Sequence, residues 1–171
     1  MSDEGLAADA ATGDRAAFGR LVQQHQSLLR GFLLRLTRGD KALADDLGQD
    51  AFLDAWRKIA QFRGTGSFRG WLLRIAYTRY LMEARRRKLE PLEDVTQQAE
   101  AVAGMEPGTR FDLERCMAKL SLGERSALTL CYALGHSSEE AAVILGSPVG
   151  TVKSHVLRGR KKLLEMLGDA P

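Results

Sequence analysis

Apolar residues recur at three- and four-residue steps through most of this chain, which is the spacing of amphipathic helices. Residues 14–38 predict one helix that begins near Asp14. Its apolar stripe consists of Phe18, Leu21, Val22, Leu28, Leu29, Phe32, Leu33 and Leu36. The pattern as a whole predicts an all-α fold.

Residues 41–59 predict a second helix with two different faces. At about 100° per residue, one broad arc is apolar and contains Ala44, Leu47, Ala51, Phe52, Ala55 and Ile59. The opposite arc, which we expect to face outward, contains Asp46, Gln49, Asp50, Leu53 and Arg57. Acidic residues around an apolar anchor are typical of a docking surface for a basic partner helix. A solvated face with one stray leucine is the alternative.

Residues 60–70 contain three glycines, which argue against a stable helix and predict a flexible loop that carries Phe62 and Phe68. A helix over residues 71–88 follows, with apolar residues almost all round. One of its apolar sides can pack into the core of its own domain, and the other must be covered by another partner.

Aromatic and basic residues are concentrated in this part of the chain, because seven of the eleven aromatics lie between Phe52 and Tyr80, interleaved with arginines. Aromatic rings beside a basic track hold unpaired nucleic-acid strands by base stacking. Trp71, Tyr77 and Tyr80 could instead fill the core of a small bundle, and we expect that of at least two of them. Phe62, at the start of the glycine loop, is the best candidate for stacking.

Residues 137–162 predict a helix-turn-helix. Ser137 and Glu140 have the spacing of a capping box, and Gly146 ends the first short helix. Pro148 fits the first turn of the second helix, which has an apolar stripe and a polar, basic face. That face contains Thr151, Lys153, Ser154, His155, Arg158, Lys161 and Lys162. A helical hairpin with a solvated basic face is the alternative.

The composition divides the chain into two units. Residues 89–109 contain two prolines, two glycines and an excess of acids without a helical period, which predicts a linker. We therefore expect two small helical domains, 1–88 and 110–171, joined by a flexible acidic linker, 89–109. Helices over residues 111–120 and 123–134 are expected to support the helix-turn-helix.

The overall composition excludes several classes of protein. Apolar residues make up 44% and charged residues 27% of the chain, values that exclude disorder throughout. No apolar run is long enough to span a membrane, and the acidic N-terminus does not resemble a signal peptide, so we expect a cytoplasmic protein. Cys116 and Cys131 have no metal-ligand spacing and are expected to be reduced thiols. No enzyme, metal or cofactor constellation is recognisable.

The net charge is only +3, but the charges are segregated. Residues 57–88 carry ten lysines and arginines and a single acid, Glu83. Residues 89–114 carry seven acids and a single arginine, Arg110. Blocks of opposite charge predict different partners for different segments.

Three motifs, in this order, resemble the extracytoplasmic-function (ECF, group IV) sigma factors of bacterial RNA polymerase. They are D-D-L-G-Q-D-A-F-L-D-A-W over 45–56, F-R-G-T-G-S-F-R-G-W-L-L-R-I-A over 62–76 and G-S-P-V-G-T-V-K-S-H-V-L-R-G-R over 146–160. The resemblance covers residues 18–167. It implies a sigma-2-like helical bundle and a sigma-4-like helix-turn-helix domain.

The resemblance also implies functions for three sets of residues. Binding to the clamp coiled coil of the largest core polymerase subunit is expected of Asp46, Gln49, Asp50, Leu53 and Arg57. Recognition and opening of the −10 promoter element is expected of Phe62, Arg63, Ser67, Arg69, Trp71, Arg74, Thr78, Arg85 and Arg86. Recognition of the −35 element as a duplex is expected of Thr151, Lys153, Ser154, His155, Leu157, Arg158 and Lys161. The second domain would also pack on the polymerase flap, and an anti-sigma factor is an expected partner.

Four positions depart from the family pattern. Thr78 and Met82 stand where family members often carry asparagine and an acid, and His155 stands where they carry arginine. Ala141 replaces a larger aliphatic residue. We interpret these departures as changes in promoter preference.

Two other functions are compatible with parts of the sequence. The first is a stand-alone helix-turn-helix regulator that binds an operator as a dimer, which the separate basic and aromatic block in the first half disfavours. The second is an enzyme acting on nucleic acid. The scattered His25, His136 and His155 make an enzyme improbable.

Overall fold

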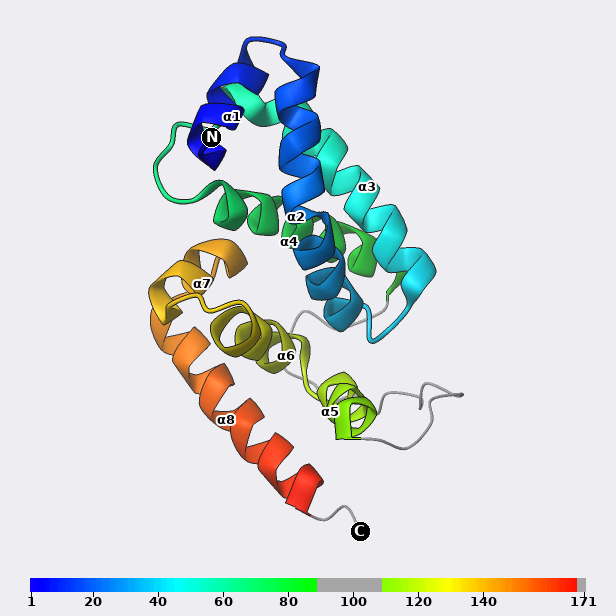
Figure 1. Ribbon diagram of the computed structural model, residues 1–171. Helices are drawn as coiled ribbons and strands as arrows, with labels where there is room; N and C mark the ends of the chain where they lie inside the picture. Colours follow the sequence, from blue (N-terminus) through cyan, green and yellow to red (C-terminus); the bar gives the residue numbers. More distant parts are fainter. Residues whose placement is uncertain (89–108, 169–171) are drawn as a thin grey trace.

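A computed structural model of the chain describes residues 1–88 and 109–168 (Figure 1). The described residues form helices and no strand, which confirms the predicted all-α fold. The predicted linker lies outside the described residues except for Thr109, where a helix begins. None of the described helices is long and apolar enough to cross a membrane.

The N-terminal half consists of α1 (Asp3–Ala11), α2 (Arg15–Leu36), α3 (Lys41–Lys58), the short 3-10 helix η1 (Ile59–Gln61) and α4 (Phe68–Arg87). The two long predicted helices are confirmed, because Asp14 caps α2 and Asp40 caps α3 through bonds from backbone N–H groups. The sequence-based prediction was wrong at α4, which begins at Phe68, three residues earlier than expected, because Ser67 accepts a 3.0 Å hydrogen bond from Gly70 N and caps the helix.

The C-terminal half consists of α5 (Thr109–Ala118), α6 (Leu122–Leu128), the π-helical turn η2 (Thr129–Ala133), α7 (Ser138–Leu145) and α8 (Val149–Gly168). Helices α7 and α8 are the predicted helix-turn-helix. Ser137 Oγ caps α7 by accepting from Glu140 N, and Gly146 ends it in the left-handed conformation with φ 62°. Helix α8 then begins directly after Pro148.

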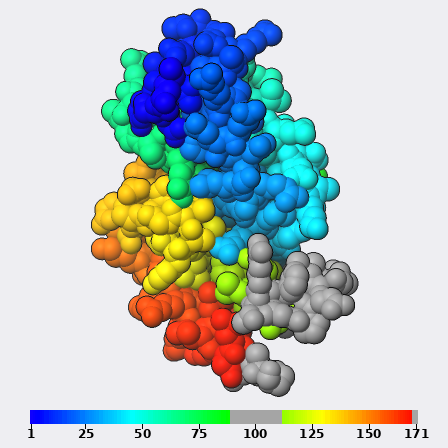
Figure 2. All heavy atoms as spheres, viewed as in Figure 1, coloured from blue at the N-terminus to red at the C-terminus, as the bar shows by residue number. Residues whose placement is uncertain are grey.

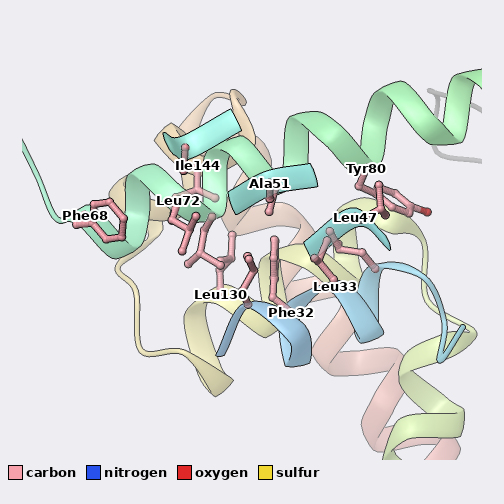
Figure 3. Packing of buried hydrophobic residues seen from close by; sticks show 14 of the residues in the cluster. Phe32, Leu33, Leu47, Ala51, Phe68, Leu72, Tyr80, Leu130 and Ile144 are labelled. Atoms are coloured by element: carbon pink, nitrogen blue, oxygen red, sulfur yellow. The ribbon is translucent and has the colours of Figure 1, made fainter. Parts of the chain in front are cut away.

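The two halves share one hydrophobic core. Helix α7 packs on α4, and α6 packs on α2, so the occupant that the sequence left open for α4 comes from the C-terminal half. Figure 3 shows Leu130 and Ile144 of this half beside Phe32 and Leu72 of the N-terminal half. In the space-filling view the C-terminal half, coloured yellow to red, lies directly against the N-terminal half, coloured blue to green (Figure 2). We call this arrangement the closed arrangement.

Arg125 of α6 fastens the two halves together. Its side chain is fully buried, and its guanidinium donates hydrogen bonds of 2.8 Å to the backbone oxygens of Arg35 and Leu36 at the end of α2 and of Leu120. The last carbonyl groups of a helix have no N–H partner within the helix and carry partial negative charge. A buried cation at this end therefore provides hydrogen-bond donors and a compensating positive charge. A partly buried ion pair also joins α2 to α5, with 3.0 Å between Arg35 Nη2 and Glu114 Oε1.

Candidate nucleic-acid interface

Helix α8 packs against the other helices of the C-terminal half through one face only. Val152 is completely buried, and Val149, Val156 and Leu163 are partly buried, as the predicted apolar stripe requires. Gly159 allows a close crossing over α6, because a Cβ atom there would lie 2.7 Å from Leu128 Cδ1. Helix α8 makes its main contacts with α5, α6 and α7, so the N-terminal half does not cover its outer face.

The outer face of α8 carries six of the seven predicted −35 residues in exposed positions. These are Thr151, Lys153, Ser154, Leu157, Arg158 and Lys161. Leu157 is 71% exposed, although an apolar side chain of that size normally packs. Lys162, by contrast, donates to the buried Glu124, with 2.7 Å between Nζ and Oε1, and so holds α8 to α6.

His155 differs from the other six residues, because it is half-buried rather than on the outer polar face. Its ring packs over Gly123 of α6, where a Cβ atom would lie 2.5 Å from Cε1 and Nε2. Its Nδ1 lies 2.9 Å from Arg158 Nη2. His155 therefore stands between the buried face of α8 and the exposed Arg158.

The predicted partner-binding face of α3 is exposed. Asp46, Gln49, Asp50, Leu53 and Arg57 all lie outward, and Leu53 is 52% exposed. Gln49 and Leu53 also line an open groove of about 570 Å³ between α2 and α3, with Phe18, Phe52 and Trp56 at its base and Arg15 and Val22 beside them. Acidic side chains therefore lie next to an apolar hollow.

The glycine loop is more tightly packed than the sequence suggested. Phe68 is completely buried, and the half-buried Phe62 packs against it and against Trp71, with ring centroids 5.7 Å and 5.4 Å apart. Phe62, the predicted stacking residue, is therefore held in place on one side and partly exposed on the other, because the early start of α4 brings Phe68 and Trp71 against it. Of the predicted −10 residues in this loop, Arg63 and Ser67 are exposed.

The first turn of α4 lies in the contact between the halves. Arg69 is half-buried and its Nη2 donates to the backbone oxygen of Leu134. A Cβ atom at Gly70 would lie 3.9 Å from Ile144 Cδ1 of α7. The predicted −10 residue Arg69 is thus engaged by the C-terminal half in the closed arrangement.

Further along α4, the remaining predicted −10 residues Arg74, Thr78, Arg85 and Arg86 are exposed. Thr78 Oγ1 donates to Arg74 O at 2.9 Å. Arg86 and Arg87 both bond Glu83, each with an N–O distance of 2.6 Å. These two guanidinium groups, Arg86 foremost, lower the pKa of Glu83 to about 2, so Glu83 carries charge at neutral pH and partly neutralises the basic end of α4.

Asp54 and Arg79 join α3 to α4, the helices that carry the predicted polymerase-binding and −10 residues. Arg79 Nη2 donates to Asp54 Oδ1 at 2.7 Å, and its Nε donates to the other carboxylate oxygen. Hydrogen bonding by Arg79 lowers the pKa of the Asp54 carboxyl despite its burial. The acidic face of α3 and the basic face of α4 are therefore held in one orientation.

Sequence reasoning missed Arg125 and helix α1. A lone arginine among apolar residues gives no sign of the distant carbonyl groups that it binds. Helix α1 had a usable signal, because Leu6, Ala7 and Ala10 form an apolar stripe and Ser2 caps it. His25 Nε2 lies 2.8 Å from Asp3 Oδ2 and ties α1 to α2.

The two halves match two family models, Sigma-70 region 2 over residues 21–90 and Sigma-70, region 4 over residues 110–163. The ECF RNA polymerase sigma factor SigM of Mycobacterium tuberculosis (strain H37Rv) is 37% identical over 170 residues, which cover 98% of this chain and 85% of SigM. The RNA polymerase sigma factor CnrH of Cupriavidus metallidurans is 34% identical over 186 residues, which cover 97% of this chain and 94% of CnrH.

Two solved structures are similar over most of the chain. One contains the sigma factor RpoE in complex with the anti-sigma factor NepR from Bartonella quintana, with a TM-score of 0.73, 29% identity and coverage of 90% of this chain and 98% of that chain. The other contains CnrH in complex with the cytosolic domain of CnrY, with a TM-score of 0.74, 30% identity and coverage of 99% and 100%. This chain belongs to the ECF family of RNA polymerase sigma factors, which are alternative sigma factors for promoter-specific transcription.

Proposed function

We propose that this sigma factor binds core RNA polymerase through the outer face of α3, recognises the −35 element as a duplex through α8, and opens the −10 element with the loop before α4 and with α4 itself. The observation that carries the proposal is the outer face of α8. It is exposed, contains no acid between Gly146 and Leu164, and is supported from behind by Val152 and Gly159. A helix of this kind fits the major groove of a duplex.

Recognition of the −35 duplex would divide between charge and shape. Lys153 and Lys161 provide salt-dependent attraction to phosphates. Ser154 and Arg158 provide hydrogen bonds to base edges, and the exposed Leu157 provides an apolar contact to the methyl group of thymine. An exposed leucine at the centre of a basic helix face is thereby explained.

The polymerase contact is supported by the combination of charge and shape on α3. Asp46 and Asp50 surround the exposed Leu53, which borders the groove between α2 and α3. A basic partner helix that inserts an apolar side chain there would satisfy both features. We assign this partner to the clamp coiled coil of the largest polymerase subunit.

Opening of the −10 element is supported by the aromatic and basic residues before and along α4. Flipping a base out of the stack costs a few kcal/mol. Stacking on Phe62 and attraction to Arg63, Arg74, Arg85 and Arg86 would offset that cost. Polymerase binding would provide the rest.

Promoter binding by both halves requires the closed arrangement to open. The two promoter elements lie roughly two turns of B-DNA apart, at about 34 Å per turn. In the closed arrangement α7 packs on α4, and Arg69 is engaged by Leu134 O. We therefore propose that polymerase binding separates the halves.

An anti-sigma factor is the proposed regulatory partner. RpoE and CnrH, which resemble this chain over 90% or more of its length, were both solved with a second protein, NepR in one case and the cytosolic domain of CnrY in the other. A protein that binds the α3 face, or holds α7 on α4, would keep this sigma factor from polymerase.

Run-off transcription with bacterial core RNA polymerase on genomic fragments tests the proposal. We expect initiation that depends on this protein and maps to sites with a shared upstream sequence. The variant Asp50→Lys should remain folded and lose binding to core polymerase, whereas Asp9→Lys, the same change on the exposed side of α1, should remain folded and keep that binding. Tight operator binding without polymerase, together with no initiation, would identify a stand-alone regulator and contradict the proposal.

A further inference from the structure

The position of the His155 ring is set by α6 and not by α8 alone. The ring lies directly over Gly123, where even a methyl group would come within 2.5 Å of Cε1 and Nε2. One turn further along α8, Gly159 makes the close crossing over Leu128, and Lys162 bonds Glu124 with 2.7 Å between Nζ and Oε1. These contacts fix the helix on the C-terminal side of the ring, and the completely buried Val152 fixes it on the N-terminal side, so Nδ1 of His155 has a defined position.

The contact between His155 and Arg158 has a direction that the chemistry of the two groups decides. Arg158 Nη2 and His155 Nδ1 are 2.9 Å apart. A guanidinium group can only donate hydrogen bonds, so Nδ1 is the acceptor of this bond.

An acceptor in a fixed position orients the guanidinium of Arg158. A guanidinium has several N–H groups in one plane, so a bond to His155 does not exhaust its donors. The orientation of this plane decides whether arginine meets the edge of a guanine, with two parallel hydrogen bonds, or a phosphate, which carries no sequence information. Arg158 lies on the exposed outer face of α8, beside Ser154 and Leu157.

We infer that His155 is a positioning residue for promoter recognition, because its Nδ1 acceptor holds the Arg158 guanidinium in the direction from which it recognises one base pair of the −35 element. This inference rests on the proposed function of α8. It assigns His155 no contact with DNA. Gly123 contributes to the same positioning, because its lack of a side chain leaves space for the His155 ring.

Four variants distinguish the orientation of the Arg158 guanidinium from the packing of the His155 ring on Gly123. Arg158→Ala removes the guanidinium. His155→Phe keeps an aromatic ring over Gly123 and removes the acceptor. His155→Asn loses the ring and can keep an oxygen acceptor near the position of Nδ1. Gly123→Ala displaces the ring, at small cost to stability, because the far end of a flexible side chain can rotate away.

The experiment uses holoenzyme assembled from the full chain and bacterial core RNA polymerase. It transcribes a promoter library in which the upstream element is randomised, and transcripts are sequenced to give the base preference at each position. Arg158→Ala should reduce the preference for guanine at one position by about fivefold or more, the discrimination expected of a bidentate contact. His155→Phe and Gly123→Ala should reduce it at the same position, and His155→Asn should retain most of it. Melting temperatures show that each variant is folded.

A double variant adds an independent readout. Gly123→Ala in the His155→Phe background should change the base preference no further, because both act through the same acceptor. The inference is overturned if Arg158→Ala alters the preference while His155→Phe leaves it as in the wild type, or if His155→Asn loses as much as His155→Phe. A wild-type holoenzyme that shows no upstream preference overturns the proposed function of α8 itself, and the inference with it.

Discussion

The two surfaces predicted to bind DNA differ in their relation to the contact between the halves. The outer face of α8 is exposed, and its main contacts are with helices of its own half. The first turn of α4 is covered by α7, and Arg69 donates to Leu134 O of the C-terminal half. One surface is therefore complete in the closed arrangement, and the other is partly covered.

In the proposed function, this difference means that separating the halves affects −35 and −10 binding unequally. A duplex could reach α8 in either arrangement. Single-stranded −10 DNA requires α4 to be uncovered. A change that opens the halves should therefore raise affinity for the unpaired strand and leave duplex recognition by α8 in place.

The largest expected effect is that of Arg125→Met, which breaks the contact between the halves. It leaves the backbone oxygens of Leu36 and Leu120 without their buried donor, whereas Arg35 O keeps a 3.3 Å bond from Arg38 N. We expect a loss of at least about 2 kcal/mol in the free energy of unfolding, because each unsatisfied buried group costs about 1–3 kcal/mol. Denaturant titration measures this loss, and small-angle scattering should show a larger radius of gyration.

Arg115→Met, an exposed position on the neighbouring α5, is the control for Arg125→Met and should change neither measurement. If the halves separate, binding of the Arg125→Met variant to single-stranded −10 DNA should increase. An unchanged radius of gyration with native stability would show that Arg125 does not hold the closed arrangement.

The second effect sharpens the account of how α8 is supported. Gly159→Ala places a methyl group 2.7 Å from Leu128 Cδ1 and 3.2 Å from Glu124 Cβ, so the buried Leu128 side chain or α8 itself must shift. Overpacking of this kind costs about 1–3 kcal/mol. Thermal unfolding measures it. Gly150→Ala, on the same helix with open space around it, should instead be neutral or slightly stabilising.

The third effect separates two neighbouring lysines of α8. Lys161→Ala should lower the salt dependence of duplex binding by about one unit of slope and leave stability unchanged, because Lys161 is exposed and faces the phosphates in our proposal. Lys162→Ala should lower stability and leave the salt dependence unchanged, because it leaves Glu124 Oε1 without its cation. Binding titrations at several salt concentrations, together with thermal melts, distinguish them. Equal effects on the slope would contradict the assigned outer face of α8.

The smallest effect concerns the basic end of α4. Glu83→Gln releases Arg86 and Arg87, so affinity for single-stranded DNA should rise modestly. Exposed ion pairs of this kind contribute little to stability. Because the pKa of Glu83 is lowered from 4.5 to about 2, this contribution is fully present above the unfolded value and is lost as pH falls towards 2. The stability difference between Glu83→Gln and the wild type should therefore narrow on acidification.

Local patterns predicted the elements of this fold well. The three- and four-residue period gave α2 and α3 and identified the outward position of Asp50 and Leu53, which the structure confirms. The turn chemistry of Ser137 and Gly146 gave the helix-turn-helix. Such features depend on neighbours within a few residues, so one sequence is enough to predict them.

The contacts between distant elements could not be predicted in the same way. Phe68 was assigned to a flexible loop because three glycines surround it, yet the early start of α4 buries it completely. His155 was assigned to the polar face of α8, and only the position of Gly123 on α6 shows that its ring turns inward. The packing of α7 on α4 likewise has no local signal.

The carbonyl groups at the end of α2 have a consequence for how the protein is made. Arg125 follows Arg35 and Leu36 by 90 and 89 residues. At roughly 5–20 residues per second, a ribosome needs on the order of 5–20 s to add that length of chain. During this interval the end of α2 exists without the guanidinium that caps it, and water must bind the carbonyl group of Leu36 instead. Every newly synthesised molecule thus passes through an open form before its shared core can close.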